Sequence, residues 1–113
     1  MSTEYENIAV EKRDQVAWMR MESTSRFNSL NLKMGEELFD VAVNLSEDDS
    51  VRCIVLVGSE GVFNSGADLS LLEGSGNDAP TLRKLASMLH DVIEQLNHAP
   101  KPVITGVNGV AAG

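Results

Sequence analysis

Hydrophobic and polar residues follow different patterns in successive parts of this chain. Residues 5–10 and 15–21 are short runs of strand-forming residues, and the charged residues 11–14 between them indicate a hairpin. An almost uninterrupted apolar run at Cys53–Val57, rich in valine and ended by glycine, predicts a central strand covered on both faces. A similar short run at 103–107 predicts another strand.

Two longer segments, 32–45 and 81–97, carry apolar residues at helical spacing. Each therefore predicts an amphipathic helix with one apolar face. Asn31 is the expected N-cap of the first helix, and Pro100 and Pro102 end the second. Strand, loop and helix units alternate along the chain, which indicates the α/β class.

The stretch after the central strand, residues 63–68, has the sequence FNSGAD. Its small side chains let a ligand approach the backbone, and Asp68 is a good N-cap for a short helix. Free N–H groups at a helix start favour an anion or a developing negative charge. The pattern leaves an alternative open, a strand-to-helix turn that binds nothing.

Composition limits the function classes. The chain has 113 residues and a net charge of −8, which argues against a partner with a phosphate backbone such as nucleic acid. Cys53 is the only cysteine, so an internal disulfide is excluded. No segment predicts a secretory signal or a membrane span, and a cytoplasmic location is expected. His90 and His98 have no further ligands at metal-binding spacing, so no metal site is expected.

The chain ends in a glycine- and alanine-rich turn, 108–113, directly after a predicted strand. The alternation of elements predicts a further helix there, so we expect an incomplete fold. An uncovered strand at 103–107 and the apolar face of 81–97 would then be buried by self-association, and the chain alone is not expected to be a stable monomer.

Three motifs carry a resemblance to a known family: RFNSLN at 26–31, VRCIVLVGSEGVFNSGADLSLL at 51–72, and KPVITGVNGVAAG at 101–113. In this order they closely resemble the enoyl-CoA hydratase/isomerase (crotonase) family. The likeness covers the chain from Tyr5 onward but only about the N-terminal half of a full member. It implies an α/β fold, the truncated N-terminal portion of a crotonase-like ββα superhelix, with 1–113 a partial acyl-CoA-binding domain. The NGVAAG turn resembles the branch of ring-epoxide isomerases that act on phenylacetyl-CoA.

The resemblance implies an acyl-CoA hydratase or double-bond isomerase, a lyase or isomerase of fatty acid metabolism. Family members stabilise an enolate-like thioester oxygen with two backbone N–H groups, the oxyanion hole. By resemblance the first donor is the N–H of Ala67, and the second belongs to the residue just after Gly113. Coenzyme A is part of the substrate and no separate cofactor is implied. The full-length family is expected to form homo-oligomers, trimers or hexamers, without a membrane or nucleic-acid partner.

The resemblance also implies a set of residues that bind the coenzyme A portion. In the loop before the first helix they lie near the nucleotide, and in the loop after the central strand they line the adenine and pantetheine path. These residues are Ser25, Arg26 and Phe27 in the first loop, and Ser65, Gly66, Asp68 and Leu69 in the second. Asp68 is expected to cap a short helix and not to carry protons. The chain departs from the family where a proline usually precedes the first loop: Thr24 and Ser25 stand there instead.

The acid–base residues of the family come from beyond Gly113. Glu60 and Glu73 flank the second loop, but we interpret them as solvated loop carboxylates. General acid–base chemistry needs a carboxylate within hydrogen-bond reach of the substrate carbon, so this chain alone is expected to be inactive. Two alternatives stay open: a non-catalytic acyl-CoA-binding module, and a self-associating unit without a ligand.

Overall fold

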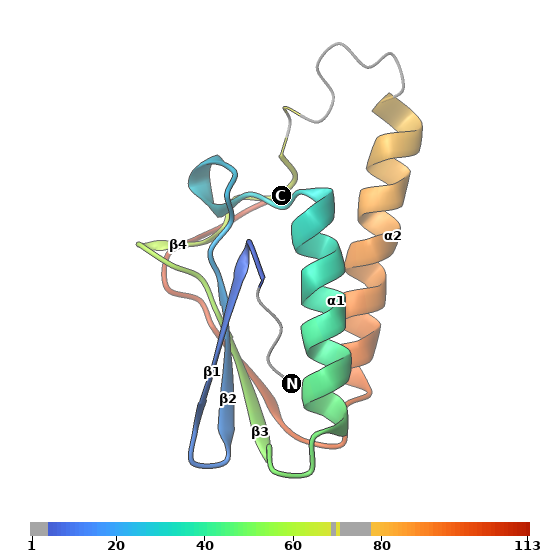
Figure 1. Cartoon of the computed structure of the whole chain (residues 1–113). Helices are drawn as coiled ribbons and strands as arrows, with labels where there is room; N and C mark the ends of the chain where they lie inside the picture. Colours follow the sequence, from blue (N-terminus) through green and yellow to red (C-terminus); the bar gives the residue numbers. More distant parts are fainter. Residues whose placement is uncertain (1–4, 69, 71–77) are drawn as a thin grey trace.

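The computed structural model describes residues 5–68, 70 and 78–113. Strands and helices alternate along these residues, with one short 3₁₀ turn before the first helix (Figure 1). The elements are β1 (Ile8–Arg13), β2 (Val16–Met21), η1 (Arg26–Asn28), α1 (Leu32–Glu47), β3 (Cys53–Val57), β4 (Val62–Asn64), α2 (Asp78–Asn97), β5 (Val103–Gly106) and β6 (Val110–Ala111).

The main sheet has the strand order β1-β2-β3-β5. β1 and β2 form an antiparallel hairpin, and β3 and β5 join in parallel. The prediction that residues 11–14 form the turn is wrong for Glu11 to Arg13, which pair with β2 as part of β1. Charged residues are compatible with this edge strand because they face solvent, where Arg13 stacks over Trp18 at 4.9 Å. The turn itself is Asp14 and Gln15, with Asp14 at φ 57°.

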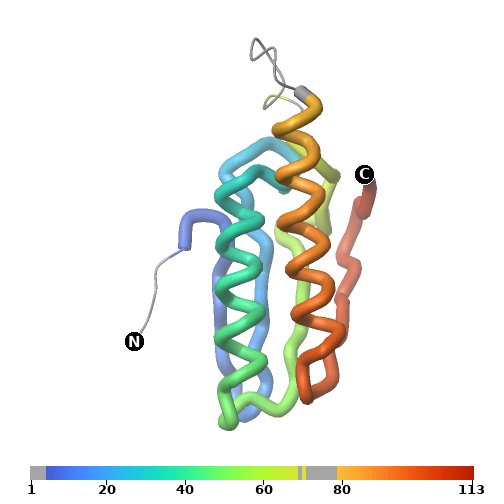
Figure 2. Tube along the Cα trace, turned by 90° about the vertical axis from the view of Figure 1, so that its right-hand side faces the viewer, coloured from blue at the N-terminus to red at the C-terminus, as the bar shows by residue number. Residues whose placement is uncertain are grey.

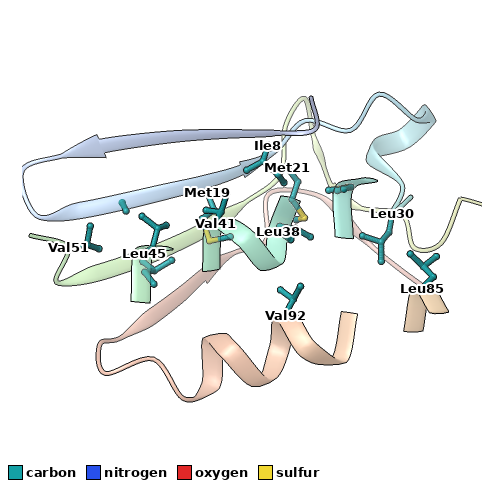
Figure 3. Packing of buried hydrophobic residues seen from close by; sticks show 13 residues of the cluster. Ile8, Met19, Met21, Leu30, Leu38, Val41, Leu45, Val51, Leu85 and Val92 are labelled. Carbon is teal, nitrogen blue, oxygen red and sulfur yellow. The ribbon is translucent and has the colours of Figure 1, made fainter. Parts of the chain in front are cut away.

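Helices α1 and α2 lie side by side on one face of the sheet (Figures 1 and 2). The alternation in β2 places Ala17, Met19 and Met21 in the core beneath them. The buried cluster joins both helices to the sheet (Figure 3). The helices approach closely at Gly35, where a Cβ would lie 3.2 Å from Met88 Cε. The core therefore follows from the periodic apolar positions of these elements.

Both predicted helices are confirmed, with shifted ends. The Asn31 side chain accepts from the N–H of Met34 at 2.8 Å, which confirms the N-cap. At the other end of α1, Lys101 Nζ donates to the carbonyls of Leu45 and Asp48 at 2.8 Å each. α2 begins three residues before the predicted start, because Pro80 is tolerated in a first turn, where its missing N–H needs no partner.

The face of the sheet opposite the helices corrects one expectation. β3 was predicted to be covered on both faces, yet no helix of the described residues lies on this side, and Cys53 and Val57 are only half-buried. Val55 is nonetheless buried because its neighbours in register, Trp18 and Ile104, flank it. Within the described part of the chain, no helix combines the length and the apolar character needed to cross a membrane.

A second, two-stranded sheet was not predicted from the sequence. β4 pairs in parallel with β6, with Val62 opposite Val110 and Asn64 opposite Ala111. Strands of two and three residues are too short to show a periodic pattern. This pairing brings the end of the chain against the loop after β3, and so it positions the candidate site.

Candidate functional site

An open groove of about 650 Å³ lies between the loop before α1 and the loop after β4. Both loops lie at the same end of the molecule as the C-terminus, the upper end in Figure 1. The residues that line the groove are Thr24, Ser25, Arg26, Phe27, Ser29, Ser65, Ala67, Asp68 and Ser70. The fold thus brings the two predicted coenzyme A loops together. Leu69, also predicted there, lies outside the described residues.

The backbone N–H of Ala67 is held between two paired neighbours. Leu30 donates its N–H to Gly66 O at 2.7 Å and accepts from the N–H of Asp68 at 2.9 Å. In this parallel bridge the residue in the middle, Ala67, turns its own N–H away from Leu30. No described group accepts a hydrogen bond from that N–H, and Ala67 is exposed in the groove wall. The site therefore offers a fixed, unpaired backbone donor.

Gly113 lies directly against the turn that carries Ala67. A Cβ on Gly66 would be 2.8 Å from Gly113 Cα, and one on Gly113 would be 2.5 Å from Gly66 Cα. Both glycines have positive φ, 99° and 94°. The N–H of Ala112 donates to Asn64 O at 2.9 Å and holds the two segments together. Glycine is required at both positions because no side chain fits between the backbones.

The loop before α1 is organised by Asn28, which is buried. Its Oδ1 accepts from the N–H of Ser23 at 2.7 Å. Its Nδ2 donates to the carbonyls of Met21 at 2.9 Å and Phe63 at 3.0 Å. One side chain thus joins the end of β2, the loop and β4. Sequence reasoning gave Asn28 no role, although asparagine tolerates its left-handed φ of 55°.

Arg26 and Phe27 form the outer rim of the groove. Phe27 has a left-handed φ of 56°, which is uncommon for a bulky side chain, and it is 66% exposed. The guanidinium carbon of Arg26 lies 5.1 Å from the Phe27 ring centroid. No described carboxylate forms an ion pair with Arg26. Its positive charge is available to an anionic ligand at this end of the groove.

Ser25 and Asp68 connect the two walls of the groove. Ser25 Oγ donates to Asp68 Oδ2 at 2.6 Å and accepts from Asn31 Nδ2 at 3.0 Å. The other carboxylate oxygen, Oδ1, accepts from the N–H and Oγ of Ser70 at 3.0 and 2.7 Å. The bonds from Ser25, and then those from Ser70, lower the pKa of Asp68. Both carboxylate oxygens are therefore occupied by local donors. The short helix that Asp68 was predicted to cap lies outside the described residues.

Two further asparagines support the loops, and neither was assigned a role from the sequence. Asn64 Oδ1 accepts from the N–H of Gly66 at 2.8 Å. Asn108 Oδ1 accepts from the N–H of Gly58 at 2.9 Å. The available signal was the residue type itself, because asparagine side chains commonly satisfy nearby backbone groups in loops.

Acidic residues other than Asp68 do not line the groove within the described part of the chain. Glu60 is exposed in a turn after β3, and Glu73 lies outside the described residues. Across residues 5–68, 70 and 78–113, no three histidine, cysteine, aspartate or glutamate side chains gather as a metal site would require. His98 lies on the surface of the helix end, 3.3 Å from Glu94.

Comparison with known proteins relates the chain to one family. Residues 11–113 match the sequence model of the family described as enoyl-CoA hydratase/isomerase. Over 109 residues the chain is 33% identical to 4-chlorobenzoyl coenzyme A dehalogenase-2 from Arthrobacter sp., covering 95% of this chain and 40% of that protein. Over 101 residues it is 34% identical to 1,2-epoxyphenylacetyl-CoA isomerase from Escherichia coli K12, covering 87% and 38% respectively. The second match confirms the expected likeness to a ring-epoxide isomerase.

Comparison with solved structures relates the fold to the same family. An enoyl-CoA hydratase from Bacillus anthracis superimposes with a TM-score of 0.84 at 30% identity, covering 94% of this chain and 41% of that one. The α/β fold is thus the N-terminal portion of a crotonase-like fold, as predicted. The chain spans about 40% of the length of the relatives that it matches.

Proposed function

Because the chain belongs to the enoyl-CoA hydratase/isomerase family, we propose that its groove binds an acyl-CoA thioester and that Ala67 donates its N–H to the thioester oxygen. One observation carries this proposal: the N–H of Ala67 is unpaired among the described residues while Gly66 and Asp68 on either side of it are both bonded to Leu30. The proposed reaction of the protein that contains this chain is the hydration or migration of a double bond next to the thioester, a lyase or isomerase step.

The physical argument concerns where charge develops. A thioester oxygen is neutral in the substrate and becomes negative in an enolate-like transition state. A donor that is already aimed at this position favours the transition state over the ground state and needs no reorganisation during the reaction. Removing one such donor typically costs about 3 kcal/mol in the barrier.

The second donor in this proposal is the N–H that follows Gly113. The contact between Gly66 and Gly113 supports it, because it brings the glycine-rich end of the chain against the turn that carries Ala67. Two donors from two adjoining turns would converge on one oxygen. Together they form the proposed oxyanion hole.

The coenzyme A portion would occupy the rest of the groove. The chain carries a net charge of −8, so a phosphate-bearing ligand needs a local positive charge to approach. Arg26 has no ion-pair partner among the described residues and provides that charge at the rim. Ser25, Phe27, Ser65, Gly66 and Leu69 are proposed contacts along the path. No cofactor besides the substrate's own coenzyme A is proposed.

Several reactions of the family are compatible with these 113 residues. At 30–34% identity, its relatives carry the names of a dehalogenase, an isomerase and a hydratase. We propose that the acid–base carboxylates follow Gly113, since Asp68 is the only carboxylate among the described groove residues and is occupied by Ser25 and Ser70. The 113 residues alone are then inactive.

The test is an Ala67→Pro substitution in a chain extended past Gly113 to the length of its relatives. Proline has no N–H, so hydration of crotonyl-CoA or isomerisation of an enoyl-CoA should fall at least ~100-fold while coenzyme A still binds. Ala67→Gly keeps the N–H and serves as the matched control. Full turnover in a folded Ala67→Pro protein would show that the oxyanion role is wrong.

A second candidate function is a non-catalytic acyl-CoA-binding or self-associating module. The self-associating form is favoured by exposed apolar side chains between the middle of β5 and β6, where Ile104 is 54%, Val107 59% and Val110 57% exposed. Such a surface is commonly buried against another copy. Sedimentation of the 113-residue chain tests the self-associating module: we expect concentration-dependent association, and a sharp monomer peak would exclude it. Calorimetric titration of the same chain with acetyl-CoA tests the acyl-CoA-binding module, which an absence of binding would exclude. The homo-oligomer and the cytoplasmic location expected from the sequence remain proposals.

A further inference from the structure

A buried polar cluster joins Asn7, the residue before β1, to Glu37 of α1. Asn7 is fully buried and Glu37 is 5% exposed. Glu37 Oε1 accepts from the backbone N–H of Asn7 at 3.0 Å and from its Nδ2 at 2.8 Å, and Oε2 accepts from the N–H of Glu6 at 2.6 Å. No described cation pairs with Glu37, so N–H groups and not a positive charge satisfy the carboxylate. A buried carboxylate is costly unless such donors surround it.

This arrangement fixes which way the Asn7 amide points. Since Nδ2 donates to Glu37, Oδ1 faces the opposite way, toward the loop that precedes η1. There it accepts both donors of Thr24, the backbone N–H at 2.8 Å and the hydroxyl at 3.1 Å. The carbonyl of Asn7 also accepts from the N–H of Glu22 at 2.7 Å.

Thr24 is the first residue of the groove wall. The wall continues through Arg26 to Phe27, whose left-handed backbone is strained and persists only where neighbouring contacts hold it. The loop has no proline to restrict it, and the N–H that Thr24 donates is one that a proline could not offer. The position of Thr24 at the start of the wall is therefore fixed by its hydrogen bonds to Asn7.

We propose that Asn7 is a positioning residue for the groove: oriented by Glu37, its amide holds Thr24 and sets the conformation of the wall from Thr24 to Phe27. The identity of the ligand, an acyl-CoA, rests on the proposed function. A wall that is already in its binding conformation loses less freedom when the ligand binds, and this raises affinity.

The first test acts from the exposed side, where folding is not at risk. Thr24→Val removes only the hydroxyl donor, and Thr24→Ser keeps it. We expect Thr24→Val to weaken coenzyme A binding by the 113-residue chain about fivefold, the size of one hydrogen bond, and to lower the melting temperature by only a few degrees, so that the chain stays folded at the temperature of the measurement. Thr24→Ser should bind like the unaltered chain. Equal affinities for all three chains would contradict the proposal.

The second test acts on the buried side. Asn7→Asp places a carboxylate against Glu37 and removes the Nδ2 donor. Asn44→Asp makes the same chemical change at an exposed position of α1 and serves as the control. In the double variant Asn7→Asp with Glu37→Gln, the amide donor is on residue 37 and the carboxylate acceptor is on residue 7, the reverse of the unaltered chain. Amide hydrogen exchange at Thr24 is compared with exchange at Met19 in the core, which reports global unfolding.

We expect Asn7→Asp to accelerate exchange at Thr24 at least ~10-fold more than at Met19, and the double variant to recover part of this difference. If both amides accelerate equally, Asn7 only stabilises the fold and the proposal is overturned. If Thr24 responds selectively while no chain binds coenzyme A, the positioning role stands and the proposed ligand is wrong.

Discussion

The two ends of the described structure are held together by different interactions. Where α1 and α2 cover the sheet, apolar side chains at regular spacing are buried (Figure 3). Among them Met19, Ile54 and Val41 are almost entirely enclosed. At the groove end, the loops are held by asparagine side chains bonded to backbone groups and by the contact of Gly66 with Gly113. One end is built from burial and the other from hydrogen bonds and backbone fit.

The difference matters because burial has no direction and hydrogen bonds do. Apolar contacts can stabilise an element without deciding where any single N–H points. A donor such as the Ala67 N–H needs its neighbours fixed within a few tenths of an ångström. Substitutions in the core should therefore lower stability and leave ligand affinity of the folded molecule unchanged, and substitutions at the groove end should alter affinity.

The largest expected effect is in the core. Ile54→Ala should lower the free energy of unfolding by about 2–5 kcal/mol, because it leaves a cavity in a fully buried position. Ile104→Ala is the matched control at an exposed position and should change stability by about 0.5 kcal/mol. Urea denaturation measures both. A change in the coenzyme A affinity of the folded Ile54→Ala chain would show that packing in the core also controls the groove.

Gly66 tests backbone fit at the groove end. Gly66→Ala should cost about 3 kcal/mol, because it adds a clash with the Gly113 backbone to the strain of a positive φ. Gly61→Ala, at φ 79° with nothing within 4 Å of the added Cβ, isolates the strain and should cost about 1 kcal/mol. Thermal unfolding gives the stabilities and calorimetric titration gives coenzyme A affinity. Only Gly66→Ala should weaken binding; equal affinities would show that the contact does not shape the groove.

Lys101 offers a hydrogen-bonded contact far from the groove. It donates to two carbonyls at the end of α1, where a positive charge is favourable. Lys101→Met should cost about 1 kcal/mol in unfolding free energy without changing coenzyme A affinity. Lys84→Met, on the exposed side of α2, should stay within about 0.5 kcal/mol. A loss of affinity in Lys101→Met would mean that the two ends are coupled.

The smallest effect concerns Asp68, because its carboxylate is only half-buried and solvent screens it. Its pKa is lowered in the folded chain, chiefly by Ser25. The ionised carboxylate therefore stabilises the fold above its ordinary pKa of 3.8, and this contribution is lost as pH falls through the lower folded value. Melting temperatures between pH 6 and pH 3 should fall less steeply for Asp68→Asn than for the exposed control Asp49→Asn. An identical pH dependence of the melting temperature in the two variants would contradict a stabilising hydrogen bond between Ser25 and Asp68.

The sequence by itself determined the layer of helices and sheet. Apolar positions repeat with the periods of a strand and a helix, so β2, β3, α1 and α2 were predictable, and Asn31 was recognisable as a cap from its type and place. The loop of Ala67 stood out because its residues are small. What these signals share is that they lie within a few neighbouring residues.

Only the tertiary structure decided how the groove closes. The β4–β6 pairing, the bond of Asn108 to Gly58 across 50 residues, and the bonds of Asn7 to Thr24 across 17 residues each depend on one or two contacts. Single long-range hydrogen bonds have no period and leave no pattern in the sequence. The helices and strands were therefore determined by the repeated burial of apolar residues, which a sequence displays. The direction of the Ala67 N–H was determined by individual hydrogen bonds and contacts, which only the folded chain brings together.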